Sequence, residues 1–284
     1  MRRWPRWVRG PLQLVLVGAV ALVVVALATG RWTMPDWVVE QESSSARPTP
    51  TVTQTPSLTT APPEPQESRD CTAASTDGIP QQPGALAPLP SAADAFAALP
   101  TLTVAPRSHG DSYCRGRFGP DDWPDLDGNG CTTRQDVLVR SARQVTTRPI
   151  AAHGNTCQEA ISGTWVDAYT GTTLTFTNLK DSRQAAQIQI DHLVPLYNAW
   201  VSGAWAWTDR QRVTFAQDLD APELYAVAGT VNFAKNHAGV ETWSPVPDRR
   251  CDYARSWVAV KSKYSLTVTS AEQAALTTML QACG

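Results

Sequence analysis

The sequence lacks the signatures of several familiar protein classes. Its six cysteines include no Cys-x-x-Cys arrangement, which argues against a zinc ribbon or a thioredoxin-like redox motif. There is no His-Glu-x-x-His motif, so a metalloprotease or a peptidoglycan hydrolase has no support in the sequence. No internal repeat is present. The formal net charge is -2, so no global basic field holds a long polyanion, and nucleic-acid binding requires a local patch or a metal ion.

The first thirty residues have the features of an export signal. Arginines at positions 2, 3, 6 and 9 make residues 1–9 a basic segment, expected in the cytoplasm, and a largely apolar run follows over residues 10–30. About eighteen apolar residues just span a bilayer, which favours a transmembrane signal anchor. The small residues of Ala26-Leu27-Ala28 favour a cleaved signal peptide instead. Either alternative places the rest of the protein outside the cytoplasm, on the cell membrane or secreted.

Residues 31–106 have the composition of a disordered linker. They are dense in Pro, Ser, Thr, Ala and Gln and contain few large apolar residues. Such a segment cannot bury enough surface to offset the entropy of ordering its backbone. We therefore expect an extended, proline-stiffened stalk that separates the following domain from the membrane. Its one candidate element is a short helix over residues 92–99.

Residues 107–284 form the expected globular domain. Most of the tryptophans, all four histidines and nearly all the cysteines lie here. Alternating and periodic apolar residues predict both strands and helices, hence an α+β domain. The expected strands cover residues 163–166, 174–176, 187–190 and 224–227, the first two joined as a hairpin. The expected helices cover residues 135–145, 198–203, 208–218, 253–263 and 270–282.

Two short segments carry residues suited to cutting a phosphodiester bond. That reaction needs a base to activate water, a group to orient the base, and a cation to hold the leaving oxygen. The first segment ends an apolar run with Asp191-His192, and the second supplies Asn232, Lys235 and His237 within six positions. His192 would be the base and Asn232 the orienting residue. Asp191 and His237 would be the metal ligands, and Lys235 would contact phosphate.

This pattern, with several others in the same order, resembles the HNH endonucleases of the ββα-metal superfamily. The core Asp191-His192-x-x-Pro195-Leu196 is followed by Asn232-x-x-Lys235, as in a group of secreted or surface actinobacterial members. Further segments that resemble the family are residues 130–138, 163–171, 198–200, 243–245 and 251–255. The resemblance extends over roughly residues 110–284.

The resemblance implies both a fold and a reaction. The fold would be a ββα-metal finger elaborated with extra helices and disulfides, in which His192 closes the first strand and Asn232 leads from the second strand into a helix. The reaction would be metal-dependent hydrolysis of phosphodiester bonds in DNA, with RNA as a second substrate and little sequence specificity. Arg134 and Arg255 lie in matched segments and are candidates for contacts with phosphate.

One position departs from the pattern expected of relatives. They would carry Gly-Asp after the lysine, whereas this chain has Asn236-His237. An imidazole can replace a carboxylate as a ligand but is softer and neutral, so the identity of the ion is open. We expect Mg²⁺ or Mn²⁺, with Zn²⁺ as the alternative. The same departure supports a second hypothesis, in which the domain is a non-catalytic, disulfide-stabilised binding module of the cell envelope with an idle HNH-like site.

A second ion site is predicted at an acidic loop upstream. Asp125, Asp127 and Asn129 stand at the first, third and fifth positions of a calcium loop of the EF-hand type, with Gly130 at the sixth. Asp136 takes the twelfth position, where the longer Glu is usual. The loop would bind a structural Ca²⁺. The alternative is an acidic turn stabilised by Asx hydrogen bonds.

Six cysteines after an export signal predict disulfide bonds, although the sequence leaves their connectivity open. We expect the pairs Cys131–Cys157 and Cys251–Cys283. This leaves Cys71 with Cys114, a pair that would fasten the end of the linker to the domain. The sequence identifies no protein partner. The expected partners are nucleic acid and, if the signal is uncleaved, the membrane.

Overall fold

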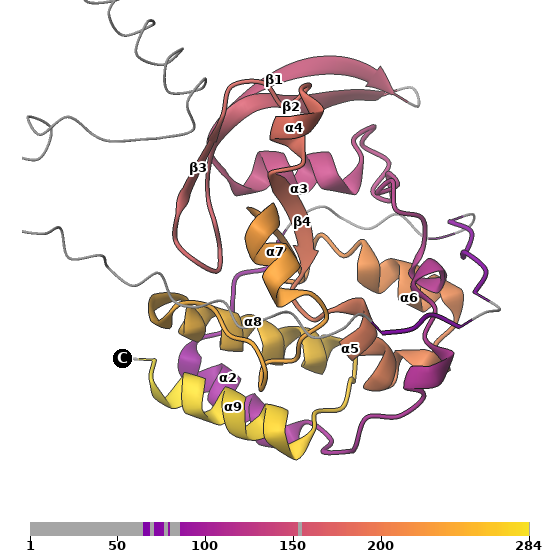
Figure 1. The fold of residues 1–284 in the computed structure, drawn as a ribbon, viewed down its shortest axis with the longest axis vertical. Coiled ribbons are helices and arrows are strands. Elements are labelled where there is room, and N and C mark those ends of the chain that lie inside the picture. Colours follow the sequence, from indigo (N-terminus) through magenta and orange to yellow (C-terminus); the bar gives the residue numbers. More distant parts are fainter. Residues whose placement is uncertain (1–64, 69–70, 77–78, 80–85, 153–154, 284) are drawn as a thin grey trace, which may run out of the picture. The chain divides into compact units, whose positions relative to one another are not determined.

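The computed structural model describes residues 65–68, 71–76, 79, 86–152 and 155–283 (Figure 1). The predicted basic segment, the predicted span over residues 10–30 and most of the predicted linker lie outside these ranges. Within the described ranges, no helix combines the length and the apolar character needed to cross a membrane. The described residues form a mixed α+β fold with three disulfides.

The first sheet has three antiparallel strands in the order β1-β2-β3. They are β1 (Ala142–Ala152), β2 (Asn155–Val166) and β3 (Thr173–Phe176). The predicted hairpin is the β2–β3 pair, with Trp165 opposite Leu174. Its turn is closed by Asp167, whose Oδ1 accepts hydrogen bonds from the backbone of Tyr169 and Thr170. The expected strands at 163–166 and 174–176 are therefore present.

The helix expected over residues 135–145 is shorter than predicted. The observed helix α3 (Thr133–Ser141) ends where Ala142 adopts an extended conformation. The chain then enters β1, in which Gln144 pairs with Thr164 of β2. The β-branched residues that follow fit a pleated strand better than a helix, and tertiary pairing decides between the two conformations.

Helix α3 covers this sheet and closes a hydrophobic core against it. The Trp165 ring is fully buried and its Nε1 donates to the backbone oxygen of Leu138 at 2.8 Å. Val137 and Leu138 are buried in the same cluster. The Cys131–Cys157 disulfide joins the segment before α3 to β2. Helix and sheet are thus held by both apolar packing and a covalent bond.

The second sheet pairs β4 (Ile188–His192) with β5 (Leu224–Ala228) in antiparallel register. Between these strands lie α5 (Leu196–Val201) and α6 (Asp209–Ala216), and the short α4 (Ser182–Ala185) precedes β4. Helix α7 (Gly229–Lys235) begins directly after β5 and contacts both strands. The order strand, strand, helix follows the expectation, with the two intervening helices as an insertion. Asn232, however, lies inside α7 and not in a loop that precedes a helix.

Three helices pack together in the remaining part of the core (Figure 1). They are α2 (Ala92–Ala98), α8 (Arg250–Lys263) and α9 (Ser270–Gln281). The Cys251–Cys283 disulfide joins the start of α8 to the end of α9. Thr269 and Glu272 form a reciprocal capping box at the start of α9.

The folded region begins earlier than residue 107, the predicted start of the domain. Ala95, Leu99 and Leu102 are buried in the main hydrophobic core, and Val104 forms a parallel bridge with Val268. Alanines dominate α2, so the composition of this segment does not by itself indicate these buried contacts. Burial of a few well-spaced side chains against α8 and α9 is enough to order α2.

Candidate active site

A pocket of about 270 Å³ brings together the principal residues predicted for catalysis. Asp191 and His192 reach it from the end of β4, and His237 reaches it from the turn after α7. The complete lining is Pro65, Glu67, Tyr113, Arg115, Asp191, His192, Pro195, Leu196, Tyr197, Asn236 and His237. The two segments singled out in the sequence, about forty residues apart, therefore share one cavity.

The His192 side chain is held in a defined tautomer. Its Nε2 lies 2.9 Å from the carbonyl oxygen of Ala216 at the end of α6. A carbonyl oxygen can only accept, so Nε2 carries the proton and donates, and Nδ1 keeps its lone pair. The Trp123 ring stacks on the imidazole, with ring centroids 5.4 Å apart. Both contacts fix the orientation of the ring.

The electrostatic surroundings keep His192 uncharged. Burial lowers the pKa of the imidazole to about 3, and the nearby positive charge of Arg115 adds to this effect. The ring is therefore neutral at pH 7 and able to accept a proton. Its low basicity means that proton transfer from water must be assisted by something that stabilises the developing hydroxide.

Asp191, the residue before His192, belongs to a buried hydrogen-bonded group. Its Oδ2 accepts from the Tyr169 hydroxyl at 2.5 Å, and the Lys235 Nζ lies 2.9 Å from the same oxygen. Lys235 also donates to the backbone oxygen of His192 at 2.8 Å. Burial raises the pKa of Asp191, and Lys235 and Tyr169 oppose that rise by stabilising the ionised carboxylate.

His237 is directed to the pocket by a turn at Asn236. Helix α7 ends at Lys235, and Asn236 has φ 47° and ψ -131°. A positive φ combined with this negative ψ lies outside the left-handed helical region that Asn tolerates and strongly favours Gly. Asn in place of the expected Gly therefore holds a strained backbone conformation at this turn. The His237 ring then packs edge-on against Tyr197, with centroids 5.5 Å apart.

The donor set of the pocket fits a divalent ion that keeps much of its water. Asp191 offers a carboxylate with lone pairs beyond those used by Tyr169 and Lys235, and His237 offers an imidazole. In the part of the chain that the structure describes, no three His, Cys, Asp or Glu side chains cluster closely enough to hold a metal. Two protein ligands suit a hydrated Mg²⁺ or Mn²⁺, whereas a closed structural zinc site needs four.

Lys235 and Asn232 do not reach the pocket as the sequence predicted. Lys235 is fully buried and its ammonium group is engaged by Asp191 and by the His192 carbonyl. In this structure it holds Asp191 and the end of β4 together and does not line the pocket. The Asn232 amide donates to Gln189 Oε1 at 2.8 Å, so it joins α7 to β4 and does not orient the imidazole.

Arg134 and Arg255 are structural residues and do not line the pocket. The Arg134 guanidinium donates to the carbonyl oxygens of Ala185 and Ile188, before and within β4. The Arg255 guanidinium donates to Pro90 O and pairs with Asp252 on its own helix. Both were predicted to contact phosphate because they lie in segments that resemble the family. In the structure, both guanidinium groups donate to backbone carbonyl oxygens instead.

Arg115 is the pocket cation that the sequence did not reveal. Among the described residues that line the pocket, it is the only Lys or Arg. It pairs with the exposed Asp121 at 2.8 Å, and such surface pairs are weak enough to be exchanged for another anion. The sequence feature that could have indicated Arg115 is its neighbour Cys114, because the expected Cys71–Cys114 disulfide attaches this loop to the domain.

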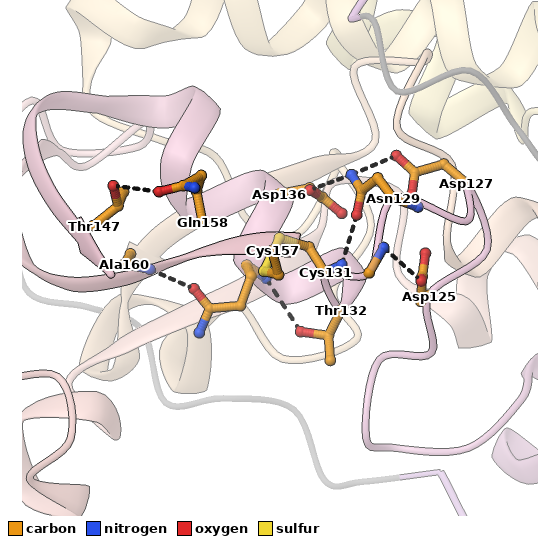
Figure 2. Close-up of a disulfide and its surroundings, with 12 residues drawn as sticks. Asp125, Asp127, Asn129, Cys131, Thr132, Asp136, Thr147, Cys157, Gln158 and Ala160 are labelled. Atoms are coloured by element: carbon orange, nitrogen blue, oxygen red, sulfur yellow. Dashed lines mark hydrogen bonds between the residues drawn. A yellow bond between two sulfur atoms is a disulfide. The ribbon is translucent and has the colours of Figure 1, made fainter. Parts of the chain in front are cut away.

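All three disulfides have the expected pairing. The acidic loop adjoins one of them, Cys131–Cys157 (Figure 2). Asp125 accepts from the backbone of Gly128 and Gly130, each at 2.8 Å. The Asn129 amide nitrogen donates to Asp127 and Asp136, each at 2.9 Å. These are the hydrogen bonds of the Asx-turn alternative, and the Asn129 side-chain oxygen is taken by Cys131 N. The calcium site stays a prediction.

Comparison with known proteins assigns the core of the chain. Residues 133–279 match the sequence model of a family described as GmrSD restriction endonucleases, C-terminal domain. The chain belongs to this family. It is also 43% identical over 196 residues to an "Uncharacterized secreted protein" of Arthroderma benhamiae, a match that covers 69% of this chain and 87% of the relative. No solved structure matches the chain.

The GmrSD-type domain accounts for most of the pocket but not for all of it. Asp191, His192 and His237 lie inside the matched region. Glu67 and Arg115 lie before it. The family assignment supports a nuclease, and the pocket combines family residues with residues that precede the family domain.

Loss of the Lys235 ammonium should destabilise the domain strongly. Lys235→Met leaves the buried Asp191 carboxylate without its partner, which costs about 3–5 kcal/mol of unfolding free energy. Urea denaturation measures the loss. The matched control Lys180→Met removes an ammonium that is 52% exposed and paired with Glu159, and should cost less than about 1 kcal/mol. Equal losses in the two variants would contradict the structural role of Lys235.

Asp136 should make the stability of the domain depend on pH. Burial raises its pKa to about 6, above its ordinary 3.8. The folded state therefore holds this proton more tightly, and its contribution to stability, complete below pH 4, is lost as pH rises through 6. Asp136→Asn should gain stability relative to wild type between pH 4 and 7, as measured by urea denaturation. A stability difference between variant and wild type that does not change with pH would contradict the raised pKa of Asp136. If the loop binds calcium, calcium ions should also stabilise wild type but not this variant.

Proposed function

We propose that this protein is an HNH-type endonuclease that hydrolyses phosphodiester bonds of DNA, and of RNA as a second substrate, outside the cytoplasm. One observation carries the proposal. A neutral histidine, His192, whose proton is held on Nε2 by the Ala216 carbonyl, lines a pocket together with Asp191 and His237. The family assignment to GmrSD restriction endonuclease C-terminal domains supports the same reaction class.

In this mechanism His192 acts as the general base. Its Nδ1 takes a proton from water while the water oxygen forms a bond to phosphorus. The bond from phosphorus to the 3'-oxygen of the sugar breaks, and the leaving oxygen takes a proton from solvent water, which leaves a 5'-phosphate and a 3'-hydroxyl. The Ala216 carbonyl keeps the proton on Nε2 and so keeps Nδ1 free to act. Arg115 provides a positive charge for the phosphate oxygens.

Asp191 and His237 would hold a divalent ion, which when bound supplies charge for the pentacovalent phosphorus and the leaving oxygen. Mg²⁺ or Mn²⁺ fits a carboxylate ligand, and the softer imidazole of His237 admits Zn²⁺ as the alternative. Tyr169 and Lys235 set the orientation of the Asp191 carboxylate. Assistance by the ion would compensate for the low basicity of His192.

The proposed location is the cell surface or the medium. Three disulfides suit an oxidising compartment, and the Arthroderma benhamiae relative is named a secreted protein. We propose the organisation that the sequence predicts: a basic segment over residues 1–9, a signal anchor or cleaved signal peptide over residues 10–30, and a linker before the domain. We also propose that the domain is of the type found in secreted or surface actinobacterial nucleases.

A second candidate is a binding module of the cell envelope with an idle site. The observation that favours it is the pairing of Asp191 with Lys235, which balances the buried carboxylate without any ion. In that case neither Asp191 nor His237 would contribute to metal binding. Calorimetric titration of wild type and of Asp191→Asn with Mn²⁺ separates the two candidates, because only the nuclease proposal expects the variant to lose affinity.

Removal of the His192 imidazole should abolish cleavage. Purified full-length protein should cut a DNA plasmid in Mg²⁺ or Mn²⁺, and His192→Ala should lower kcat by about a hundredfold or more because a general base is lost. The control is His109→Asn, since His109 is exposed, stacks on Trp205 and has a positive φ that Asn tolerates. Wild type that leaves DNA and RNA intact with Mg²⁺, Mn²⁺ and Zn²⁺ would overturn the proposal.

Exchange of the His237 ligand should change the preferred ion. His237→Asp replaces a soft, neutral ligand by a hard carboxylate, so activity with Mg²⁺ should rise relative to activity with Zn²⁺. Cleavage rates measured across a concentration series of each ion give the ratio. Tyr197→Phe is the control, because it keeps the ring that packs against residue 237 and offers no new ligand. An unchanged ratio of rates would remove His237 from the ion site.

A further inference from the structure

The wall of the pocket that precedes the family domain is built from two segments joined by a disulfide. One is the N-terminal strap, which we define as residues 65–68 and 71–76. The other is the loop that carries Tyr113 and Arg115. The Cys71–Cys114 bond links them, and Pro65 and Glu67 of the strap line the pocket beside Arg115.

The strap is seated on this loop by backbone contacts. Ser68 N donates to Tyr113 O at 2.7 Å, and Ala74 N donates to Gly116 O at 2.8 Å. A Cβ at Gly116 would lie only 3.1 Å from the Cα of Ala73, so glycine permits this close approach. The strap is thus fixed at both ends of its contact with the loop, before and after the cysteine.

Glu67 occupies an anion position at the pocket. Its Oε1 accepts from the backbone N–H of Arg115 at 3.0 Å, and its side chain lines the same cavity as His192. A phosphodiester oxygen would seek the same kind of partners, namely a backbone N–H and the guanidinium beside it. Asp191 is already balanced by Lys235, and Arg115 is shared with Asp121. The Glu67 charge therefore has no cation of its own in this cavity among the described lining residues.

We propose that Glu67, held in place by the Cys71–Cys114 disulfide, competes with substrate phosphate for the anion position beside Arg115 and so sets the substrate affinity of the pocket. This inference rests on the proposed function, because it names the phosphate backbone of a nucleic acid as the competing ligand. A carboxylate about 4 Å from a phosphate in water disfavours binding by roughly fivefold, and salt reduces the effect.

The test compares full-length wild type with Glu67→Gln, which keeps an oxygen to accept from Arg115 N–H but removes the charge. KM for a DNA substrate should fall about fivefold at low salt with kcat nearly unchanged, and the difference should shrink as salt is raised. The double variant Cys71→Ser with Cys114→Ser should lower KM in the same direction, because the strap then loses its covalent link to the loop and only backbone hydrogen bonds hold Glu67 at the pocket. Asp111→Asn is the matched control: it removes one exposed carboxylate that does not line the pocket.

Three results would overturn the proposal. A higher KM or a lower kcat in Glu67→Gln would mean that Glu67 assists the reaction. An equal fall of KM in Asp111→Asn would mean that only the net charge matters. No change in Glu67→Gln would mean that the strap does not compete. If wild type cleaves nothing, the nuclease proposal fails on its own. A binding measurement with a labelled DNA duplex then still tests the role of Glu67. It compares the single variant His192→Ala with the double variant that carries both His192→Ala and Glu67→Gln, and tighter binding by the double variant would show that Glu67 opposes binding.

Discussion

The buried ammonium of Lys235 is the interaction on which the pocket depends. It lies between the Asp191 carboxylate and the His192 carbonyl oxygen, so one side chain from α7 holds the end of β4 in place. A buried charge is tolerated only when it is paired and hydrogen-bonded, and each partner here satisfies the other. The Tyr169 hydroxyl from the β2–β3 turn completes the group. Three elements that are distant in the sequence therefore meet at one ion pair.

Neighbouring contacts turn this fixed strand end into a chemically defined site. Asp191 faces the buried group, whereas the His192 ring is stacked on Trp123 and bonded to Ala216 O. The insertion between β4 and β5 has a purpose in this arrangement, because α6 supplies the carbonyl that fixes the tautomer. The turn at Asn236 follows Lys235 directly, so the residue that anchors α7 also determines where His237 enters the pocket.

Sequence predicted the elements whose signal is local. The β2–β3 hairpin followed from a turn signal between two β-type runs, β4 from alternation and β5 from a short apolar run. Helix α9 followed from a capping box that the structure contains. Strand β1 was missed because its pairing with β2 is a tertiary choice that residues 142–147 do not reveal by themselves. The short helix expected over residues 92–99 is present as α2, but the sequence assigned it to the linker, because small alanines dominate it and give little sign that it packs on the domain.

For the site, the motif residues Asp191, His192 and His237 line one cavity, but the motif did not give the direction of every side chain. Lys235, Arg134 and Arg255 are long residues whose charged ends find buried or backbone partners, and only the fold shows which partners are within reach. Arg115 and Glu67 lie far upstream in segments with no catalytic motif. The Cys71–Cys114 disulfide joins the two segments that carry them. The positions of the cysteines in the sequence do not show which charged residues nearby will then line the pocket.

The most direct test of this account is the protonation state of His192, read from the ring nitrogen shifts of ¹⁵N-histidine-labelled protein by NMR. The account predicts a neutral ring at pH 7 with the proton on Nε2 and not on Nδ1, and a ring that stays neutral as pH falls through the usual range of histidine. A proton on Nδ1, or a charged imidazolium at pH 7, would contradict it, because the nitrogen assigned to activate water would then have no lone pair to offer.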